Sequence, residues 1–204
     1  MLESSIGNRI MKTATRQNTK DQIVDLALEL ISQKGYGGFS YQDIADVMGI
    51  KKASIHYHFA SKDDLAVAVV DRFHTLVHEW IRDNSVAGMT PLQKLEAYFR
   101  FHAQMTQNFQ KICPLCSFMT EWQNLSGVIQ KKMENFDKWH MEFIVGIIRE
   151  GQEAGEIRKD STPEEMAMFL ISGTMGALNT ARERGSEAAY YSITGQIIKG
   201  MRCR

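Results

Sequence analysis

The segment from Ser40 to Phe59 constrains the fold of this chain more than any other part of the sequence. Ala45, a small residue, is followed four positions later by Gly49 and then by Ile50. This order is typical of two short helices that cross closely, are joined by a turn with a left-handed glycine, and enclose an aliphatic side chain. The segment therefore predicts a helix-turn-helix. Its expected buried residues are Ile44, Ala45, Val47, Ile50, Ile55 and Phe59.

The remaining sequence also favours helices, because apolar residues recur at helical spacing and no run alternates as a strand does. Each of the three prolines, Pro91, Pro114 and Pro163, stands where a helix would begin, which is the position that tolerates proline best. We expect an all-α protein of nine helices. Their predicted ranges are about 19–34, 40–48, 50–58, 62–84, 91–110, 114–124, 126–153, 163–184 and 186–201.

The order of these helices predicts how the chain is divided. Residues 1–18 are expected to form a flexible N-terminal arm, residues 19–62 a three-helix domain with the helix-turn-helix, and residues 63–204 a six-helix body. The two folded parts are joined within the fourth helix, without a flexible linker. A rigid join of this kind suits a protein that transmits a motion from one part to the other.

Charge and hydropathy exclude some classes of protein but do not identify a partner. The 24 basic and 24 acidic residues balance, and residues 1–62 carry eight basic and six acidic side chains. That slight positive balance alone would not support binding to a polyanion. No apolar run approaches the ~20 residues that span a bilayer, and the N-terminus lacks the apolar stretch of a signal peptide. These features predict a cytoplasmic protein with no membrane partner.

The outer face of the second helix carries the side chains that indicate a nucleic acid. Lysines at a helix N-terminus do not complement its positive end, and a phosphate backbone nearby would turn that cost into a gain. Helices of this kind place side chains against base edges, while lysines and tyrosine hydroxyls bind phosphates. An ordinary helical corner is the alternative interpretation. The predicted contacts are Lys51, Lys52, Ser54, Tyr57 and His58, with Lys62 at the start of the next helix.

The stretch from Thr19 to Leu65 resembles the TetR/AcrR family of bacterial repressors. The residues that carry the resemblance are Gly35-Tyr36, Ser40, Ile44-Ala45, Gly49-Ile50, Lys52, Tyr57-His58-Phe59 and Ser61-Lys62. The resemblance implies a non-enzymatic transcriptional regulator that needs no cofactor. It implies a homodimer that binds a pseudo-palindromic double-stranded DNA operator and is released by a small-molecule effector.

The resemblance also implies which residues contact DNA. These are Tyr41, Lys52, Ser54, Tyr57 and Lys62, to which we add Ser40, Lys51, His56 and His58. His56 stands where the family usually has tyrosine, so the role of this position is open.

The last two helices carry a stripe of small and apolar residues, and small residues let two helices approach closely. In the family the final two helices pair with those of a second subunit, which places two recognition helices about 34–36 Å apart, one turn of B-DNA. The alternative is that the stripe packs only within one chain. The predicted dimer interface is Phe169, Gly173, Gly176, Ala177, Tyr191, Ile197 and Ile198.

The middle helices are rich in aromatic residues and methionine, and two histidines fall on or beside their apolar faces. A mostly apolar cavity with few polar groups is what a small-ligand site requires, and the family binds its effectors in this region. Each histidine is also compatible with an ordinary hydrogen-bonded position in the core. The candidate effector pocket is Phe99, His102, Met105, Phe118, Trp122, Phe136, His140 and Phe143.

Cys113 and Cys116 form a Cys-x-x-Cys pattern at a predicted helix N-terminus, where a thiol pKa is expected to be lowered. Some family members respond to electrophiles through a cysteine near this point, so a thiol-based sensor is one interpretation, and inert packing is the other. A thiol oxidoreductase would need a βαβ context that the chain lacks. No second Cys or Cys/His set supports a metal site.

Overall fold

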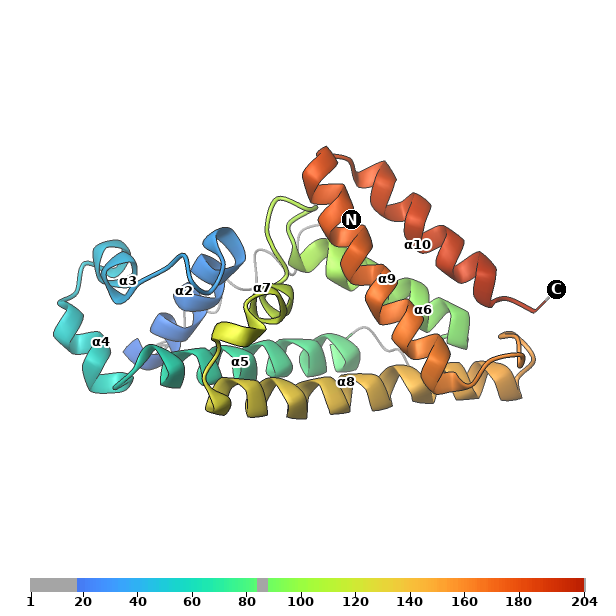
Figure 1. Cartoon of the computed structure of the whole chain (residues 1–204), viewed down its shortest axis with the longest axis horizontal. Helices are drawn as coiled ribbons and strands as arrows, with labels where there is room; N and C mark the ends of the chain where they lie inside the picture. Colours follow the sequence, from blue (N-terminus) through green and yellow to red (C-terminus); the bar gives the residue numbers. More distant parts are fainter. Residues whose placement is uncertain (1–17, 84–87, 204) are drawn as a thin grey trace. The chain divides into compact units, whose positions relative to one another are not determined.

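The computed structural model describes residues 18–83 and 88–203, and within these residues it contains nine α-helices and a short 3₁₀ turn, Trp122–Asn124 (Figure 1). The all-α prediction is confirmed. The predicted N-terminal arm lies outside the described residues apart from Asn18. The helices are α2 (Thr19–Lys34), α3 (Tyr41–Met48), α4 (Lys52–His58), α5 (Lys62–Asp83), α6 (Pro91–Met105), α7 (Pro114–Thr120), α8 (Gly127–Glu153), α9 (Pro163–Arg184) and α10 (Glu187–Met201).

The helices begin at the capping signals that the sequence contains. Ser40 and Asp43 form a capping box at the start of α3, in which each side chain bonds the other residue's backbone N–H. α6 and α9 each begin with a threonine capping box followed by Pro91 or Pro163. These local bonds satisfy backbone N–H groups that a helix leaves unpaired at its start.

α6 ends earlier than the sequence predicts, at Met105 rather than near residue 110. Three consecutive residues, Gln107, Asn108 and Phe109, have positive φ angles of 48°, 53° and 70°. A left-handed run cannot continue a right-handed helix, and it costs non-glycine residues roughly 1–2 kcal/mol each. The helix therefore ends without the glycine that usually marks such a point.

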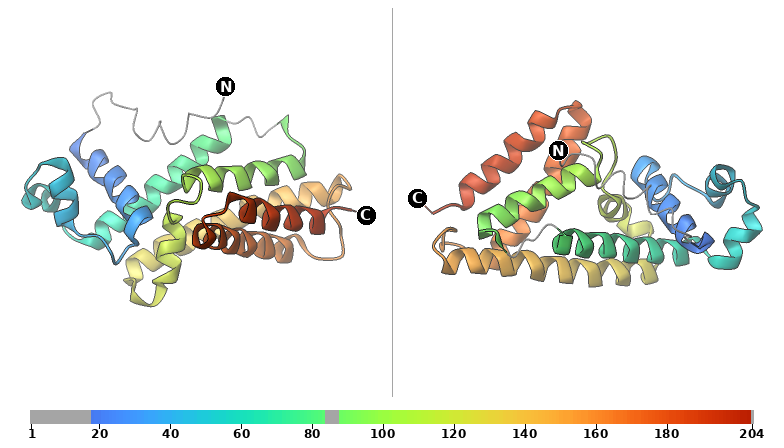
Figure 2. Two further views of the ribbon diagram at one scale, coloured as in Figure 1. Left: turned by 90° about the horizontal axis from the view of Figure 1, so that it is seen from above. Right: turned by 180° about the vertical axis from the view of Figure 1, so that it is seen from behind.

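The described chain divides into two compact units. The first holds residues up to His78 together with Ile112–Glu134, and the second holds Glu79–Lys111 and Asn135–Arg204, so α5 and α8 each belong to both. In the first unit, α2, α3, α4 and α7 pack on a core of large aliphatic and aromatic side chains such as Ile44, Ile55 and Phe118. In the second unit, α9 and α10 pack against each other and against α6 (Figures 1 and 2).

Among the described residues, no helix combines the length and the apolar character that crossing a bilayer would require.

Candidate nucleic-acid interface

The turn between α3 and α4 has the geometry that the sequence predicts. Gly49 is left-handed, with φ 65° and ψ 30°, and its N–H bonds the carbonyl of Ala45. Nothing lies within 4 Å of the position that a Cβ would take at Gly49, so its backbone angles alone favour glycine there. Ile44, Ala45, Ile55 and Phe59 are buried, as predicted.

Val47 is an exception to the predicted core, because 67% of its surface is exposed. The buried side of α3 is formed by Tyr41, Ile44 and Ala45. At about 100° per residue, Val47 lies roughly a third of a turn from the centre of that stripe. The prediction that Val47 is buried is wrong, and Tyr41, which was not among the predicted core residues, is buried.

The outer face of α4 presents a continuous set of polar and basic side chains. Lys51, Lys52 and Ser54 are exposed, and Tyr57 is 86% exposed. The ring of Tyr57 contacts that of His58, which is half-buried, edge to face at 5.2 Å. Lys51 occupies the N-cap position without a capping side-chain bond. This face is therefore available to a partner, while the opposite face is fixed by Ile55 in the core.

The polar groups of Tyr41 and Lys62 bond within the chain. The hydroxyl of Tyr41 is buried and lies 3.1 Å from the carbonyl oxygen of Phe59, and burial raises its pKa to about 12. The ammonium of Lys62 donates to the carbonyls of Tyr36 (2.6 Å) and Phe39 (2.7 Å) and lies over both rings. Burial lowers the pKa of Lys62 from its ordinary value. Both side chains hold backbone segments together.

Ser40 and His56 are exposed but engaged within the chain. The Ser40 hydroxyl donates to the carboxylate of Asp43 (2.6 Å) as part of the capping box. The ring of His56 packs edge to face on that of Tyr41, with centroids 4.8 Å apart. The imidazole of His56, at the position where the family usually has tyrosine, thus covers the buried ring of Tyr41.

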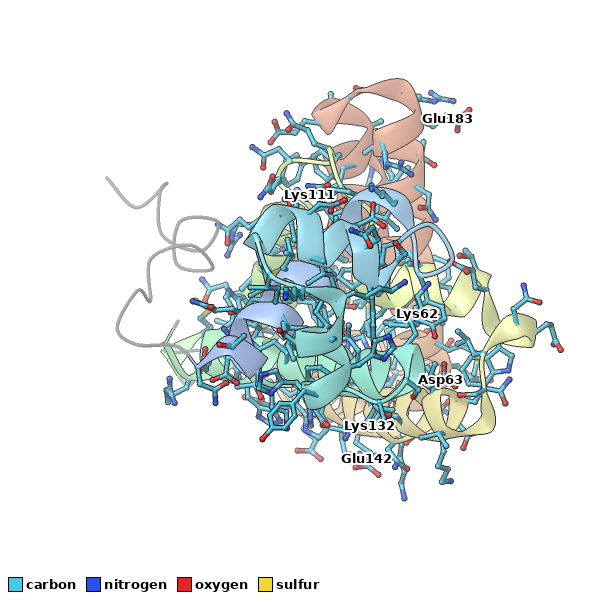
Figure 3. The ribbon with its side chains drawn as sticks, turned by 90° about the vertical axis from the view of Figure 1, so that its left-hand side faces the viewer. Lys62, Asp63, Lys111, Lys132, Glu142 and Glu183 are labelled. Carbon is cyan, nitrogen blue, oxygen red and sulfur yellow. The ribbon has the colours of Figure 1, made fainter. Side chains whose placement is uncertain are left out.

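Residues outside the predicted set fix the loop that precedes α3. The N–H of Tyr36 donates to Ser117 of α7, the N–H of Gly37 donates to Glu121, and the hydroxyl of Tyr36 donates to Asp63. Figure 3 looks onto this end of the chain, and it labels Lys62 and Asp63 at the start of α5. Ser117 and Glu121 lie about 80 residues from the loop in sequence, so no local pattern indicates them.

Two family models match the chain. The model of bacterial regulatory proteins of the tetR family covers residues 23–69, and that of the tetracyclin repressor-like C-terminal domain covers residues 91–196. The chain belongs to the TetR family. It is a non-enzymatic DNA-binding transcriptional regulator, as the resemblance implied, and the helix-turn-helix prediction is confirmed.

Relatives in the TetR family extend over most of the chain. It is 29% identical to the HTH-type transcriptional repressor DhaR of Mycobacterium sp. (strain GP1). The 165 aligned residues cover 80% of this chain and 82% of DhaR. It is 23% identical to the fatty acid metabolism regulator protein of Bacillus subtilis (strain 168), over 76% of this chain and 78% of that protein. A TetR regulator from Legionella pneumophila matches with a TM-score of 0.83 at 28% identity, over 92% of this chain and all of that one.

In this TetR-family chain, the predicted pocket residues are divided between the two units. Phe118 and Trp122 belong to the first unit, where Phe118 packs on Tyr36 with ring centroids 5.2 Å apart. The second unit contains the others. Phe143 stacks on Trp139, and the backbone carbonyl of Phe99 accepts a bond from the Tyr190 hydroxyl.

His102 and His140 both contact Tyr98, which is not among the predicted pocket residues. The ring of Tyr98 meets that of His102 edge to face at 4.5 Å and stacks on that of His140 at 5.6 Å. Both histidines are buried, and Nδ1 of His102 has no hydrogen-bond partner. Burial, together with the charge of His102, lowers the pKa of His140 to about 3. The two imidazoles are thus buried polar groups in an aromatic cluster.

Cys113 and Cys116 are both buried, with no disulfide between them. The expected lowering of a thiol pKa is wrong for Cys116, because its hydrogen bond to Cys113 and its burial both raise its pKa. A thiol held in its protonated form is a poor nucleophile. Among the described residues, no group of three or more histidine, cysteine or acidic side chains could hold a metal ion.

The stripe on α9 and α10 is divided between the interior and the surface. Ala177, Ile197 and Ile198 are buried within the chain, and a Cβ on Gly173 would lie 2.6 Å from Cδ1 of Ile197. Phe169 and Tyr191 are 61% and 43% exposed, and the surface at Gly176 is open. Met168, not predicted, is also exposed, at 62%.

Proposed function

We propose that this regulator is a cytoplasmic homodimeric repressor that binds a pseudo-palindromic operator through α4 and is released from it by a small-molecule effector. The observation that carries the proposal is the exposed face of Lys51, Lys52, Ser54 and Tyr57 on a helix that Gly49 and Ile55 hold in place. We propose residues 19–62 as the DNA-binding domain and residues 63–204 as the effector-binding and dimerisation domain. Tyr41 and Lys62 are omitted from the proposed contacts because their polar atoms bond the protein's own backbone.

Phosphate contacts and base contacts made by α4 can be distinguished by experiment. A phosphate contact contributes on every sequence, whereas a base contact contributes only on the right one. We expect Ser54→Ala to change the preferred base at one position of each half-site, costing about 1–3 kcal/mol of discrimination, while Lys52→Ala weakens all sequences alike. Competition binding against single-base operator variants measures both. Identical base preferences in Ser54→Ala and wild type would contradict a base contact by Ser54.

We propose that the effector contacts the aromatic cluster of Tyr98, His102, Phe136 and His140. A buried polar atom without a partner costs free energy, and a ligand that bonds Nδ1 of His102 would remove that cost. A thermal-shift screen of apolar and aromatic compounds, followed by operator release, identifies ligands. Hits that shift wild type and His102→Phe equally would contradict the proposed polar contact.

The buried histidine pair also predicts how stability depends on pH. The pKa of His140 is about 3 in the folded chain, against roughly 6.5 when unfolded, so only the unfolded chain takes up this proton between those values. Stability that is present above pH 6.5 is therefore lost as the pH falls, by up to about 1.4 kcal/mol per pH unit.

Replacement of His140 by phenylalanine keeps an aromatic ring and removes this proton. Urea unfolding followed by circular dichroism at pH 7, 6 and 5 should give a smaller loss of stability for His140→Phe than for wild type, by about 1–2 kcal/mol over the range. Equal losses in the two proteins would contradict a neutral buried His140.

A further inference from the structure

Two backbone N–H groups of the loop from Gly35 to Phe39, which leads into α3, bond side chains in α7 and at Glu121, the residue directly after α7. The N–H of Tyr36 donates to Oγ of Ser117 (2.8 Å), and the N–H of Gly37 donates to Oε1 of Glu121 (3.1 Å). Ser117 Oγ also lies 3.5 Å from the same carboxylate oxygen. We call Ser117 and Glu121 the α7 clamp. Two adjacent backbone donors of the loop thus depend on a distant helix.

Residues at the start of α5 bond two carbonyls of the same loop and the hydroxyl of Tyr36. Lys62 donates to the carbonyls of Tyr36 and Phe39, and the Tyr36 hydroxyl donates to Asp63 (2.9 Å). The loop is therefore held between two helices. Loss of the α7 clamp would remove the partners of the Tyr36 and Gly37 N–H groups, while the bonds to α5 would still restrain the loop.

The carboxylate of Glu121 lies close against the glycines of the loop. A Cβ on Gly37 would lie 2.7 Å from Oε2 of Glu121, and one on Gly35 would lie 3.3 Å from Oε1. The segment before α7 is fixed as well, because the N–H of Ile112 donates to the carbonyl of Ser32 in α2 (2.7 Å). The bonds between the loop and the clamp therefore depend on the position of α7.

The position of α7 in the chain makes it more than a local support. It is preceded by α6 and followed by α8, and α6 and most of α8 belong to the second unit, which contains the aromatic cluster with His102 and His140. We infer that Ser117 and Glu121 are positioning residues that set the DNA affinity of the helix-turn-helix by fixing the loop that leads into it. The inference rests on the proposed operator binding.

The test uses the full chain and measures three quantities separately: the affinity for DNA, the protection of the loop amides from hydrogen exchange, and the free energy of unfolding. We expect Glu121→Ala to lower operator affinity about tenfold per folded molecule. Glu121→Gln, whose amide oxygen can still accept the bond from Gly37, should retain part of the affinity that Glu121→Ala loses. Hydrogen exchange at the amides of Tyr36 and Gly37 should accelerate in Glu121→Ala and Ser117→Ala. Glu142→Ala, at an exposed acid of α8, is the matched control and should behave as wild type.

The outcomes distinguish the inference from the proposed function. If wild type binds no operator, the proposed function fails. If wild type binds and the Ser117→Ala and Glu121→Ala variants bind within twofold of it, the clamp supports the fold only and the inference is wrong. An affinity that falls only in proportion to the fraction of unfolded protein would also overturn the inference. A residue that only stabilises the fold lowers binding by that amount and no further.

Discussion

Replacement of Lys52 and Tyr57 together by alanine should lower operator affinity by about a hundredfold or more while leaving the free energy of unfolding within about 0.5 kcal/mol of wild type. Both side chains are exposed on α4, and Tyr57 is 86% exposed, so neither contributes appreciably to the core. On DNA the ammonium and the hydroxyl would each contact a phosphate in both half-sites of a dimer. The pair is therefore expected to matter for binding and not for folding.

Fluorescence anisotropy at several salt concentrations checks this result. Each lost lysine–phosphate contact should reduce the slope of log affinity against log salt concentration by about one. Lys159→Ala, which removes an exposed lysine between α8 and α9, is the matched control and should keep both the affinity and the slope. A double variant that binds within threefold of wild type would show that α4 is not the contact surface.

If the proposed homodimer forms through α9 and α10, replacement of Phe169 and Tyr191 together by glutamate should convert it into a monomer. These two side chains and Met168 are the large hydrophobic residues exposed on the described parts of α9 and α10. Under twofold symmetry each substitution enters the interface twice, so four carboxylates would be desolvated near one another. A monomer reaches only one half-site, and loss of the second linked contact should lower operator affinity by about 10²–10⁴.

Sedimentation velocity at micromolar concentration measures the oligomeric state. Val128→Glu introduces one carboxylate at an exposed apolar residue elsewhere, 65% exposed at the start of α8, and should leave the proposed dimer intact. If Phe169→Glu/Tyr191→Glu sediments as a dimer, the interface lies elsewhere on the chain.

Much of the fold could be predicted because helix boundaries are encoded locally. The predicted range 163–184 and the helix Pro163–Arg184 coincide, since Thr162, Glu165 and the left-handed Gly185 carry the signals at its two ends. The end of α6 could not be predicted, because the left-handed residues after it are not glycines. The exposure of Val47 depends on which side of α3 faces α2 and α4, a tertiary property.

The candidate site could be predicted where it follows helical periodicity and not where it depends on distant partners. The exposed face of α4 follows from the spacing of Lys52, Ser54 and Tyr57 around Ile55. The roles of Tyr41 and Lys62 depend on backbone carbonyls that are distant in sequence, and that of Ser117 on a loop 81 residues away. The raised pKa of Cys116 likewise depends on burial, which the Cys-x-x-Cys spacing does not indicate.

Selection of bound sequences from a random double-stranded DNA pool, with the untagged full chain, tests most directly whether two linked α4 helices bind DNA. We expect enrichment of an inverted repeat whose half-site centres lie about 10 base pairs, or a whole number of helical turns, apart. The Lys52→Ala/Tyr57→Ala variant should enrich nothing from the same pool. Enrichment by wild type of single asymmetric sites, or of no sequence at all, would contradict a homodimeric repressor that binds its operator through α4.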